Sequence, residues 1–379
     1  MWLCGVLAAM QFSKISFAFQ TLLVTYDSTP TAMGWILSTV GMVGLLLGVT
    51  AGLCAPAMGY RRLLLAGMGL GAVLALLQAL ILPFPLLWLT RLFEGASQLA
   101  VVVAAPVLII RQSAPRHHSL VMGLWSTFVA VAFAVTAAGG GWVLARFHLS
   151  GLFLAHATGL AVMCVLVLIL LPKDDAGAQP WPTLAALPGL HARLYRHWAT
   201  ALPGLCFFCY TSTAMALLTF VPQYAGADRS WVAITLPFAA ISGTLSSGWL
   251  APSLVAPGRL VLGAFAGTAL VGLGLGFCLM AGLPMALVAV LLTYMVGLAG
   301  GASFALIPYL SHEPAVQARA AGAVAQMGNL GSTLGPPLFA LTISVFGGPG
   351  LVLPVLCFAL LGCGLVMVSL GTNGRNPSV

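Results

Sequence analysis

Residues 86–110 read LLWLTRLFEGASQLAVVVAAPVLII, an apolar run that carries two charged residues, Arg91 and Glu94, in its first half. A helix needs about 20 consecutive apolar residues to cross the hydrocarbon layer, so this run is long enough to span a membrane. Lys14 lies in a second such run. Charge at this depth costs at least about 2.5 kcal/mol per group and normally marks a path for an ion or a solute. The sequence therefore predicts a membrane protein with a functional polar centre.

The composition of the whole chain supports a polytopic helical membrane protein. The 379 residues are 61% hydrophobic and 5% charged, and the mean hydropathy is +1.08, which excludes a soluble globular protein. We predict an all-α integral membrane protein with twelve transmembrane helices. The expected spans are Trp2 to Tyr26, Met33 to Cys54, Leu63 to Leu82, Leu86 to Ile110, Leu120 to Val143, Leu152 to Leu171, Ala199 to Gln223, Trp231 to Leu250, Leu260 to Ala281, Met285 to Ile307, Ala320 to Phe346, and Leu351 to Leu370.

The net charge of +8 reports membrane topology rather than nucleic-acid binding, because the basic residues lie singly at span ends. Placing both termini in the cytoplasm puts most of these residues on the cytoplasmic side. The eight cysteines lie in or beside apolar spans, so we expect no metal site and no cofactor. The sequence has no phosphate loop, nucleophile elbow or paired acids, and an enzyme is not expected.

A polar segment at residues 172–198 divides the chain into two halves, residues 1–171 and 199–379, each with six predicted spans. The halves also share a repeat, because Gly95 to Pro106 matches Gly297 to Pro308 at an offset of 202 residues. Parallel repeats of six helices, with a site between them near the membrane midplane, are typical of secondary transporters. We therefore predict two pseudo-symmetric six-helix bundles joined by a cytoplasmic linker.

The loop after the second predicted span carries a family signature. It reads Gly52-Leu-Cys-Ala-Pro-Ala-Met-Gly59-Tyr-Arg61-Arg62 and resembles the G-x-L-A-D-R-x-G-R-R/K loop of the major facilitator superfamily, with Pro56 in place of the acidic residue. The resemblance implies that Gly52, Gly59, Arg61 and Arg62 form a loop that changes during alternating access. Because Pro56 replaces the acidic residue, the contact by which that residue stabilises one conformation in the family is in doubt here.

Further motifs refine the resemblance. Arg91-Leu-Phe-Glu94-Gly95, with Pro106 downstream and Gly123-Leu-Trp125 in the fifth span, is most similar to the cyanate permease branch of this superfamily. Residues 326–337 resemble the G-x-x-x-G-P element of the second half. Residues 137–141 lack the proline of the antiporter signature, which argues against a drug exporter.

Positive charge dominates the predicted binding site. Lys14 is about 12 residues from either end of its span, roughly 18 Å deep, and Gln11 shares its helix face, which we expect to be wet. Arg91 and Glu94 lie three residues apart and can pair. We predict that Lys14 and Arg91 bind an anion and that Glu94 exchanges a proton; purely structural pairing is the alternative. Weaker candidates for the substrate-binding cavity are Trp125, Tyr210, Tyr294, Gln326 and Asn329.

The predicted function is secondary active transport of a small anionic solute, such as a monocarboxylate or a cyanate-like ion, by proton symport. The expected location is a bacterial inner membrane, and the expected partners are the solute, protons and the lipid bilayer, with no nucleic acid and a monomeric protein. An exporter of amphipathic compounds and a transporter-like sensor remain as alternatives.

Overall fold

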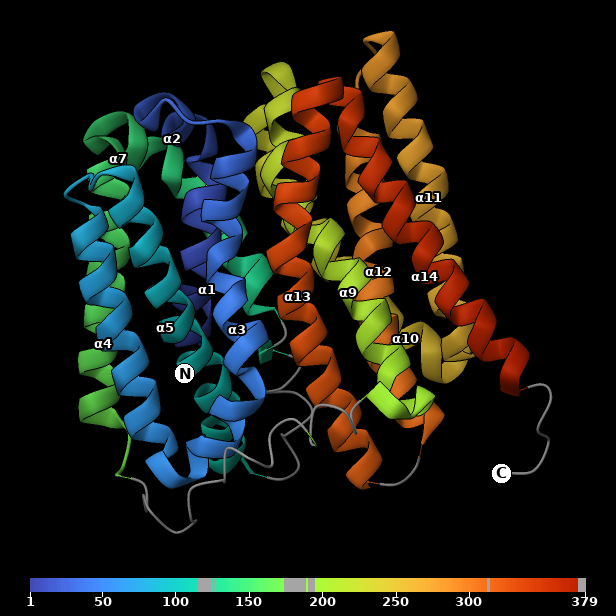
Figure 1. The fold of residues 1–379 in the computed structure, drawn as a ribbon, viewed down its shortest axis with the longest axis horizontal. Coiled ribbons are helices and arrows are strands. Elements are labelled where there is room, and N and C mark those ends of the chain that lie inside the picture. The colour runs from blue at the N-terminus through green and yellow to red at the C-terminus, as the bar shows by residue number, and fades with distance from the viewer. Residues whose placement is uncertain (115–123, 126, 174–188, 190–194, 312–313, 374–379) are drawn as a thin grey trace. The chain divides into compact units, whose positions relative to one another are not determined.

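The computed structural model describes residues 1–114, 124–125, 127–173, 189, 195–311 and 314–373, and every regular element in these ranges is a helix (Figure 1). The chain divides into two compact units, Met1–Leu187 and Pro188–Val379. Most of the predicted linker, 174–188 and 190–194, lies outside the described residues, so its boundaries stay a prediction.

The N-terminal unit contains six spans. Its helices are α1 (Trp2–Phe17), α2 (Phe19–Tyr26), α3 (Pro30–Met58), α4 (Tyr60–Gln78), α5 (Phe84–Arg111) and α7 (Phe128–Leu170). The first predicted span is broken, because α1 and α2 meet at Ala18 with a 61° bend. The fifth and sixth spans are merged into α7, whose two arms, 128–147 and 149–170, meet at a kink where His148 has φ 57°. This kink lies between Val143 and Leu152, where the sequence predicts the boundary between the fifth and sixth spans.

The C-terminal unit also contains six spans. Its helices are α9 (Trp198–Phe220), α10 (Arg229–Ser253), α11 (Pro257–Ala281), α12 (Ala286–Leu310), α13 (Pro314–Phe346) and α14 (Val352–Asn373), with short 3-10 turns at Val221–Tyr224, Gly226–Asp228 and Gly348–Leu351. In the described ranges, nine helices are long and apolar enough to cross a membrane, and the bent α1–α2 pair makes ten. Counting the two arms of α7 separately and adding the more polar α13 gives the twelve predicted spans.

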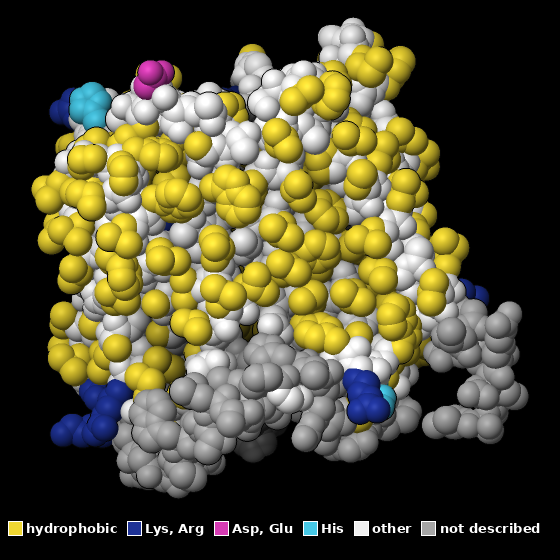
Figure 2. Space-filling model, in the orientation of Figure 1, with side chains coloured by type: hydrophobic (Ala, Val, Ile, Leu, Met, Phe, Trp, Pro, Cys, Tyr) yellow, Lys and Arg dark blue, Asp and Glu magenta, His cyan; other side chains and the backbone are white. Residues whose placement is uncertain are grey.

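Apolar side chains cover the flanks of each unit on the face shown in Figure 2, and the visible charged side chains lie toward the helix ends. Large side chains such as Leu170, Leu270 and Met280 are more than 70% exposed. This surface suits contact with lipid and would be costly in water. The two units therefore have the surface of integral membrane bundles.

Local sequence signals explain several boundaries. Thr29 caps α3 by accepting a hydrogen bond from the Ala32 amide, and Pro30 occupies the first helical position, where its missing N–H is harmless. Gly59 separates α3 from α4 with φ 85°, a conformation that favours glycine. This is one of the glycines of the predicted loop signature, and in this structure it turns the chain between α3 and α4.

The same helix pairs recur in the two units, which confirms the predicted pseudo-symmetry. The pairs α3–α5, α4–α5 and α4–α7 of the first unit correspond to α10–α12, α11–α12 and α11–α14 of the second. The repeat predicted at an offset of 202 residues holds in detail. A Cβ added to Gly95 would lie 2.6 Å from the Val40 carbonyl oxygen, and one added to Gly297 would lie 2.2 Å from the Ala240 carbonyl oxygen.

Two further contact pairs fix the correspondence of the other helices. The Cys164 thiol donates to the Leu65 carbonyl at 3.7 Å, and the Cys363 thiol donates to the Leu262 carbonyl at 3.9 Å. These pairs relate α7 to α14 at an offset of 199 and α4 to α11 at an offset of 197 residues.

The first helices of the two units also correspond to each other. Ser13 Oγ lies 2.6 Å from Thr136 Oγ1, and a Cβ on Gly335 would lie 2.3 Å from the Ser212 carbonyl oxygen. Both residues of the second pair are 199 positions after those of the first, so α1 corresponds to α9. Positions in one unit can therefore be compared with their counterparts in the other.

Candidate functional site

A buried polar cluster ties together four helices of the N-terminal unit. Lys14 comes from α1, Gln78 from α4, Arg91 and Glu94 from α5, and His156 from the second arm of α7. Lys14, Arg91 and Glu94 are the only buried charged side chains in the part of the chain that the structure describes. The three ionisable residues that stood out in the sequence thus share one site.

Lys14 uses all three of its N–H groups. Its Nζ donates to Gln78 Oε1 at 2.7 Å and to Glu94 Oε1 at 2.6 Å, and it lies 3.1 Å from His156 Nδ1. An ammonium group has three donors and no acceptor, so these contacts satisfy it completely. The Phe153 ring, with its centroid 5.3 Å from Nζ, covers the remaining side.

Glu94 is the centre of the cluster, because both of its oxygens accept hydrogen bonds. Oε1 accepts from Lys14, while Oε2 accepts from Gln78 Nε2 at 2.8 Å and forms an ion pair with Arg91 Nη1. Arg91 also donates from Nε to the Ile36 carbonyl on α3 at 3.2 Å. One carboxylate is therefore shared by two cations.

The hydrogen bonds of His156 define its tautomer. Its Nε2 lies 2.9 Å from the Leu7 carbonyl oxygen, which can only accept, so Nε2 carries the proton. Nδ1 then presents its lone pair to the Lys14 ammonium group. With a neutral imidazole, Lys14, Arg91 and Glu94 leave the cluster with one positive charge in excess.

The cluster is dry in this conformation. Lys14 is 1% exposed, and Arg91 and Glu94 are fully buried. The sequence predicted a wet face on the first helix, and this expectation is wrong here, because Gln11, Ser13 and Lys14 all pack inside the bundle. The two cations are paired with protein groups, so an anion can reach them only after a rearrangement.

Gln11 extends the polar cluster by one helical turn. Its Nε2 donates to Ser97 Oγ at 2.9 Å, and Ser97 in turn donates to the Gly67 carbonyl at 2.7 Å. Gln11 is fully buried, and its Oε1 has no hydrogen-bond partner within the described ranges. An unsatisfied buried acceptor is unusual and fits a site that gains a donor in another state.

The other predicted binding residues do not join this cluster. Trp125 packs its ring on Phe128 and against Gly5 of α1. Tyr294 lines an open groove of about 550 Å³ between α10 and α12. Asn329 donates to the Ala325 carbonyl one turn earlier in α13. These residues remain predictions for substrate binding.

Gln326 accepts a hydrogen bond from the Tyr195 hydroxyl at 3.0 Å. Burial raises the pKa of Tyr195, which precedes the first span of its unit, to about 12, so the hydroxyl remains a donor at physiological pH. The structure thus gives Gln326 a partner near the start of α9 that the sequence did not suggest.

The predicted conformational loop has a structural contact in this state. Arg61 donates to the Leu168 and Leu171 carbonyls, both at 2.8 Å, and so satisfies carbonyls at the C-terminal end of α7. Arg62 is exposed, and Gly52 lies within α3. The role of this loop in transport stays a prediction.

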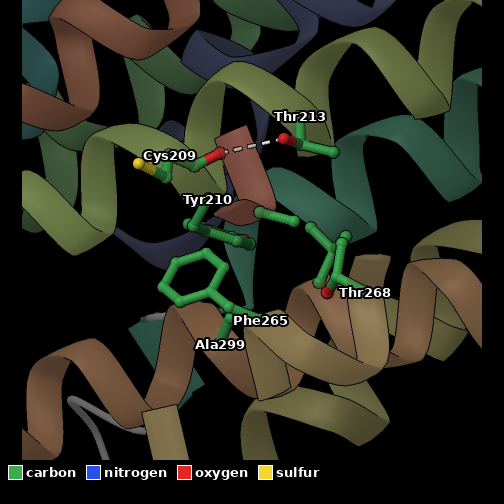
Figure 3. A pocket seen from close by; sticks show the side chains of 8 residues that line it. Cys209, Tyr210, Thr213, Phe265, Thr268 and Ala299 are labelled. Atoms are coloured by element: carbon green, nitrogen blue, oxygen red, sulfur yellow. Dashed lines mark hydrogen bonds between the residues drawn. The ribbon is translucent and has the colours of Figure 1, made fainter. Parts of the chain in front are cut away.

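The C-terminal unit has an uncharged counterpart of the cluster. Using the offsets established above, the counterparts of Lys14, Gln78, Arg91, Glu94 and His156 are Thr213, Leu275, Thr293, Val296 and Val355, all of them buried. Figure 3 shows part of this region, where Tyr210, Thr213, Thr268 and Ala299 surround a space too small for a water molecule. Thr213 donates to the carbonyl of Cys209 in its own helix.

Sequence reasoning did not select Gln78 or His156 as a site residue. Gln78 is a polar residue within an apolar run, at the end of α4, which was the available signal. A lone histidine gives no such signal, since its partners come from other helices. Only the packing of α7 against α1 and α4 reveals its position beside Lys14.

Comparison with known proteins gives concordant matches. The family model described as Major Facilitator Superfamily matches residues 1–336. The 3-(3-hydroxy-phenyl)propionate transporter of Escherichia coli (strain K12) is 28% identical over 327 residues, which cover 81% of this chain and 76% of that protein. The Methylenomycin A resistance protein of Streptomyces coelicolor is 25% identical over 207 residues, covering 53% and 41% respectively.

Solved structures show the same fold. A bacterial homologue of the human lysosomal transporter Spinster, in an inward-facing and occupied conformation, superimposes with a TM-score of 0.73 at 14% identity over 100% of this chain and 97% of that chain. Its inward-facing, unoccupied form gives a TM-score of 0.71, also at 14% identity. At this identity the likeness shows the fold alone.

Proposed function

Since the chain belongs to the major facilitator superfamily and is a membrane transporter rather than an enzyme, we propose that it moves a small organic anion by alternating access. The proposed setting is a bacterial inner membrane, with a monomeric protein, both termini in the cytoplasm and protons as the coupling ion. The proposed site is the cluster of Lys14, Arg91, Glu94 and His156.

The observation that carries this proposal is the excess positive charge of a fully buried cluster. Burying an uncompensated charge is costly, and replacing buried ion pairs by apolar groups of similar volume is often neutral or stabilising. The C-terminal unit builds the same helix packing with Thr213, Thr293 and Val296 at the equivalent positions. The bundle therefore does not need these charges in order to pack, which supports a role for them in recognising an anion.

A proton on Glu94 offers a way to couple the solute to the proton gradient. In the dry state Glu94 neutralises one of the two cations. Protonation removes that negative charge, so Lys14 and Arg91 can pair with the carboxylate of a solute instead. Proton and anion then enter the site together, which corresponds to symport.

The relatives favour an aromatic or aliphatic monocarboxylate as the solute. The Escherichia coli relative is described as a transporter of 3-(3-hydroxy-phenyl)propionate, a carboxylate with a phenol ring. We propose this class ahead of a cyanate-like ion, because the match to the Escherichia coli relative covers 81% of this chain, whereas the likeness to the cyanate permease branch rests on a few short motifs. Gln11, Trp125, Tyr210, Tyr294, Gln326 and Asn329 are proposed to contact the body of the solute.

A second candidate function is export of an amphipathic compound, since the Streptomyces coelicolor relative is described as a resistance protein. That match covers only 53% of this chain. A buried excess of positive charge suits an anion better than the cationic drugs that many exporters carry, so export ranks second.

Uptake of radiolabelled 3-(3-hydroxyphenyl)propionate into proteoliposomes with an imposed proton gradient tests the proposal. We expect accumulation by the wild type and a loss of at least about tenfold, equivalent to 1.4 kcal/mol, in Lys14→Met and Arg91→Met. Arg259→Ala, at an exposed helix end, is the matched control and should retain uptake. Glu94→Gln should exchange solute across the membrane without accumulating it. Wild-type uptake by both Lys14→Met and Arg91→Met would overturn the site.

A further inference from the structure

The three acceptors around Lys14 differ in charge. Glu94 is a carboxylate, but Gln78 and His156 supply a neutral carbonyl oxygen and a neutral imidazole nitrogen. All three lie within 3.1 Å of Nζ. The ammonium group is thus held by two groups that fix its position without cancelling its charge.

The position of His156 is itself fixed. Nε2–H donates to the Leu7 carbonyl on α1, about two helical turns before Lys14, so the ring spans two points of the same helix. The charged groups that act on His156 are Lys14 on α1 and Arg91 and Glu94 on α5. Since two of these three groups are positive, a neutral ring suits this environment better than an imidazolium.

We propose that His156 is a positioning residue for anion transport, because its Nδ1 lone pair holds Lys14 in the cluster without neutralising it. The excess positive charge then stays available to the carboxylate of the solute. This inference rests on the proposed function, since it assigns His156 a part in the same site.

The residue that corresponds to His156 in the C-terminal unit argues against a role of His156 in helix packing. Val355 occupies the equivalent position in α14 and is fully buried. An apolar residue therefore serves the helix packing at this point. The N-terminal unit instead has an imidazole at this point, and both of its nitrogens are hydrogen-bonded.

A matched pair of variants distinguishes the effect of a hydrogen-bond acceptor at position 156 from the effect of a negative charge there. In His156→Asn, the side-chain oxygen can take the place of Nδ1 and remains neutral. In His156→Asp, an oxygen of the same reach is ionised beside Lys14 and cancels the excess charge. The two variants have nearly the same shape, so a difference between them reports charge and not packing.

The experiment compares initial rates of 3-(3-hydroxyphenyl)propionate uptake in proteoliposomes, together with thermal unfolding of the purified proteins in the presence of that anion, benzoate, lactate or cyanate. We expect His156→Asn to keep the KM within about threefold, and His156→Asp to raise it by at least about tenfold, or 1.4 kcal/mol. Both variants should remain folded in the absence of anion, and His156→Asp should be no less stable than His156→Asn, because its carboxylate pairs with Lys14.

Equal KM values in the two variants, with an active wild type, would overturn the role of His156 and leave the proposed function standing. An Asn variant as impaired as the Asp variant would also overturn it, because a neutral acceptor would then not suffice. If none of the four anions stabilises or is carried by the wild type, the proposed function fails, and this inference fails with it.

Discussion

The two units of this transporter pack the same helices around different interiors. In the N-terminal unit, Lys14, Arg91 and Glu94 form a buried charged cluster, whereas Thr213, Thr293 and Val296 take these places in the C-terminal unit. The main helix pairs recur in both units, and Gly95 and Gly297 make equivalent close contacts. The fold therefore tolerates either interior, and the charges of one unit need an explanation other than packing.

The charged side chains inside the N-terminal unit are stabilised by hydrogen bonds to one another and to neighbouring polar groups. Each N–H of Lys14 and each oxygen of Glu94 has a partner. A fully satisfied network rigidifies the bundle, but any missing member leaves a buried charge unpaired. Single substitutions within the charged cluster should therefore destabilise the N-terminal unit strongly. Substitutions at the equivalent positions of the C-terminal unit should not.

The largest expected effect follows from giving the N-terminal unit one residue of its counterpart. Glu94→Val leaves Lys14 and Arg91 without their carboxylate and should lower the free energy of unfolding by about 3–5 kcal/mol. Thermal unfolding in detergent, followed by tryptophan fluorescence, measures the change. Thr213→Val, which removes a hydroxyl bonded only to its own helix, is the control in the other unit. A Glu94→Val protein as stable as the control would show that the cluster is not tightly coupled.

A smaller and symmetrical effect is expected from the glycines that bring helices together. Gly95→Ala and Gly297→Ala each place a Cβ within 2.6 Å of a carbonyl oxygen on the facing helix. Overpacking of this kind costs typically about 1–3 kcal/mol. Gly69→Ala and Gly263→Ala, where nothing lies within 4 Å, are the matched controls for the two units. Similar melting temperatures for Gly95→Ala and Gly69→Ala would contradict the packing correspondence between the units.

The smallest expected effect concerns Arg61, which satisfies carbonyls at the end of α7. Its counterpart at an offset of 197 is Gly258, so the second unit lacks this contact. Arg61→Ala should cost about 1 kcal/mol, the typical net value of an intramolecular hydrogen bond. Arg62→Ala, at the neighbouring exposed position, should change stability by less than about 0.5 kcal/mol. Equal melting temperatures for the two variants would remove the structural role of Arg61.

Much of the fold could be predicted from the sequence, because the length and the hydropathy of an apolar run identify a membrane-spanning helix. The twelve spans and the Gly95–Gly297 repeat depend on such local signals. The kink of α7 at His148 lies at the predicted boundary between the fifth and sixth spans, but the bend at Ala18 could not be predicted, because no proline or glycine marks it. This bend depends on contacts between helices.

For the site, the sequence identified the unusual charges but not their surroundings. Lys14, Arg91 and Glu94 stood out because charge is rare in apolar runs. Helices that are apolar on all sides give no indication of their rotation, so whether Lys14 faces water or protein was undetermined, and the wet interpretation is wrong for this conformation. Gln78 and His156 were missed for the same reason, since their roles arise from helix packing.

The central claim, that the buried charges serve transport and not folding, is tested most directly by replacing the cluster as a set. The triple variant Lys14→Met/Arg91→Met/Glu94→Leu keeps side-chain volume and removes every charge, so no ion is left unpaired. We predict that it folds with a melting temperature at least equal to that of the wild type and carries 3-(3-hydroxyphenyl)propionate no faster than empty liposomes. Wild-type uptake by this variant, or its failure to fold, would contradict the claim.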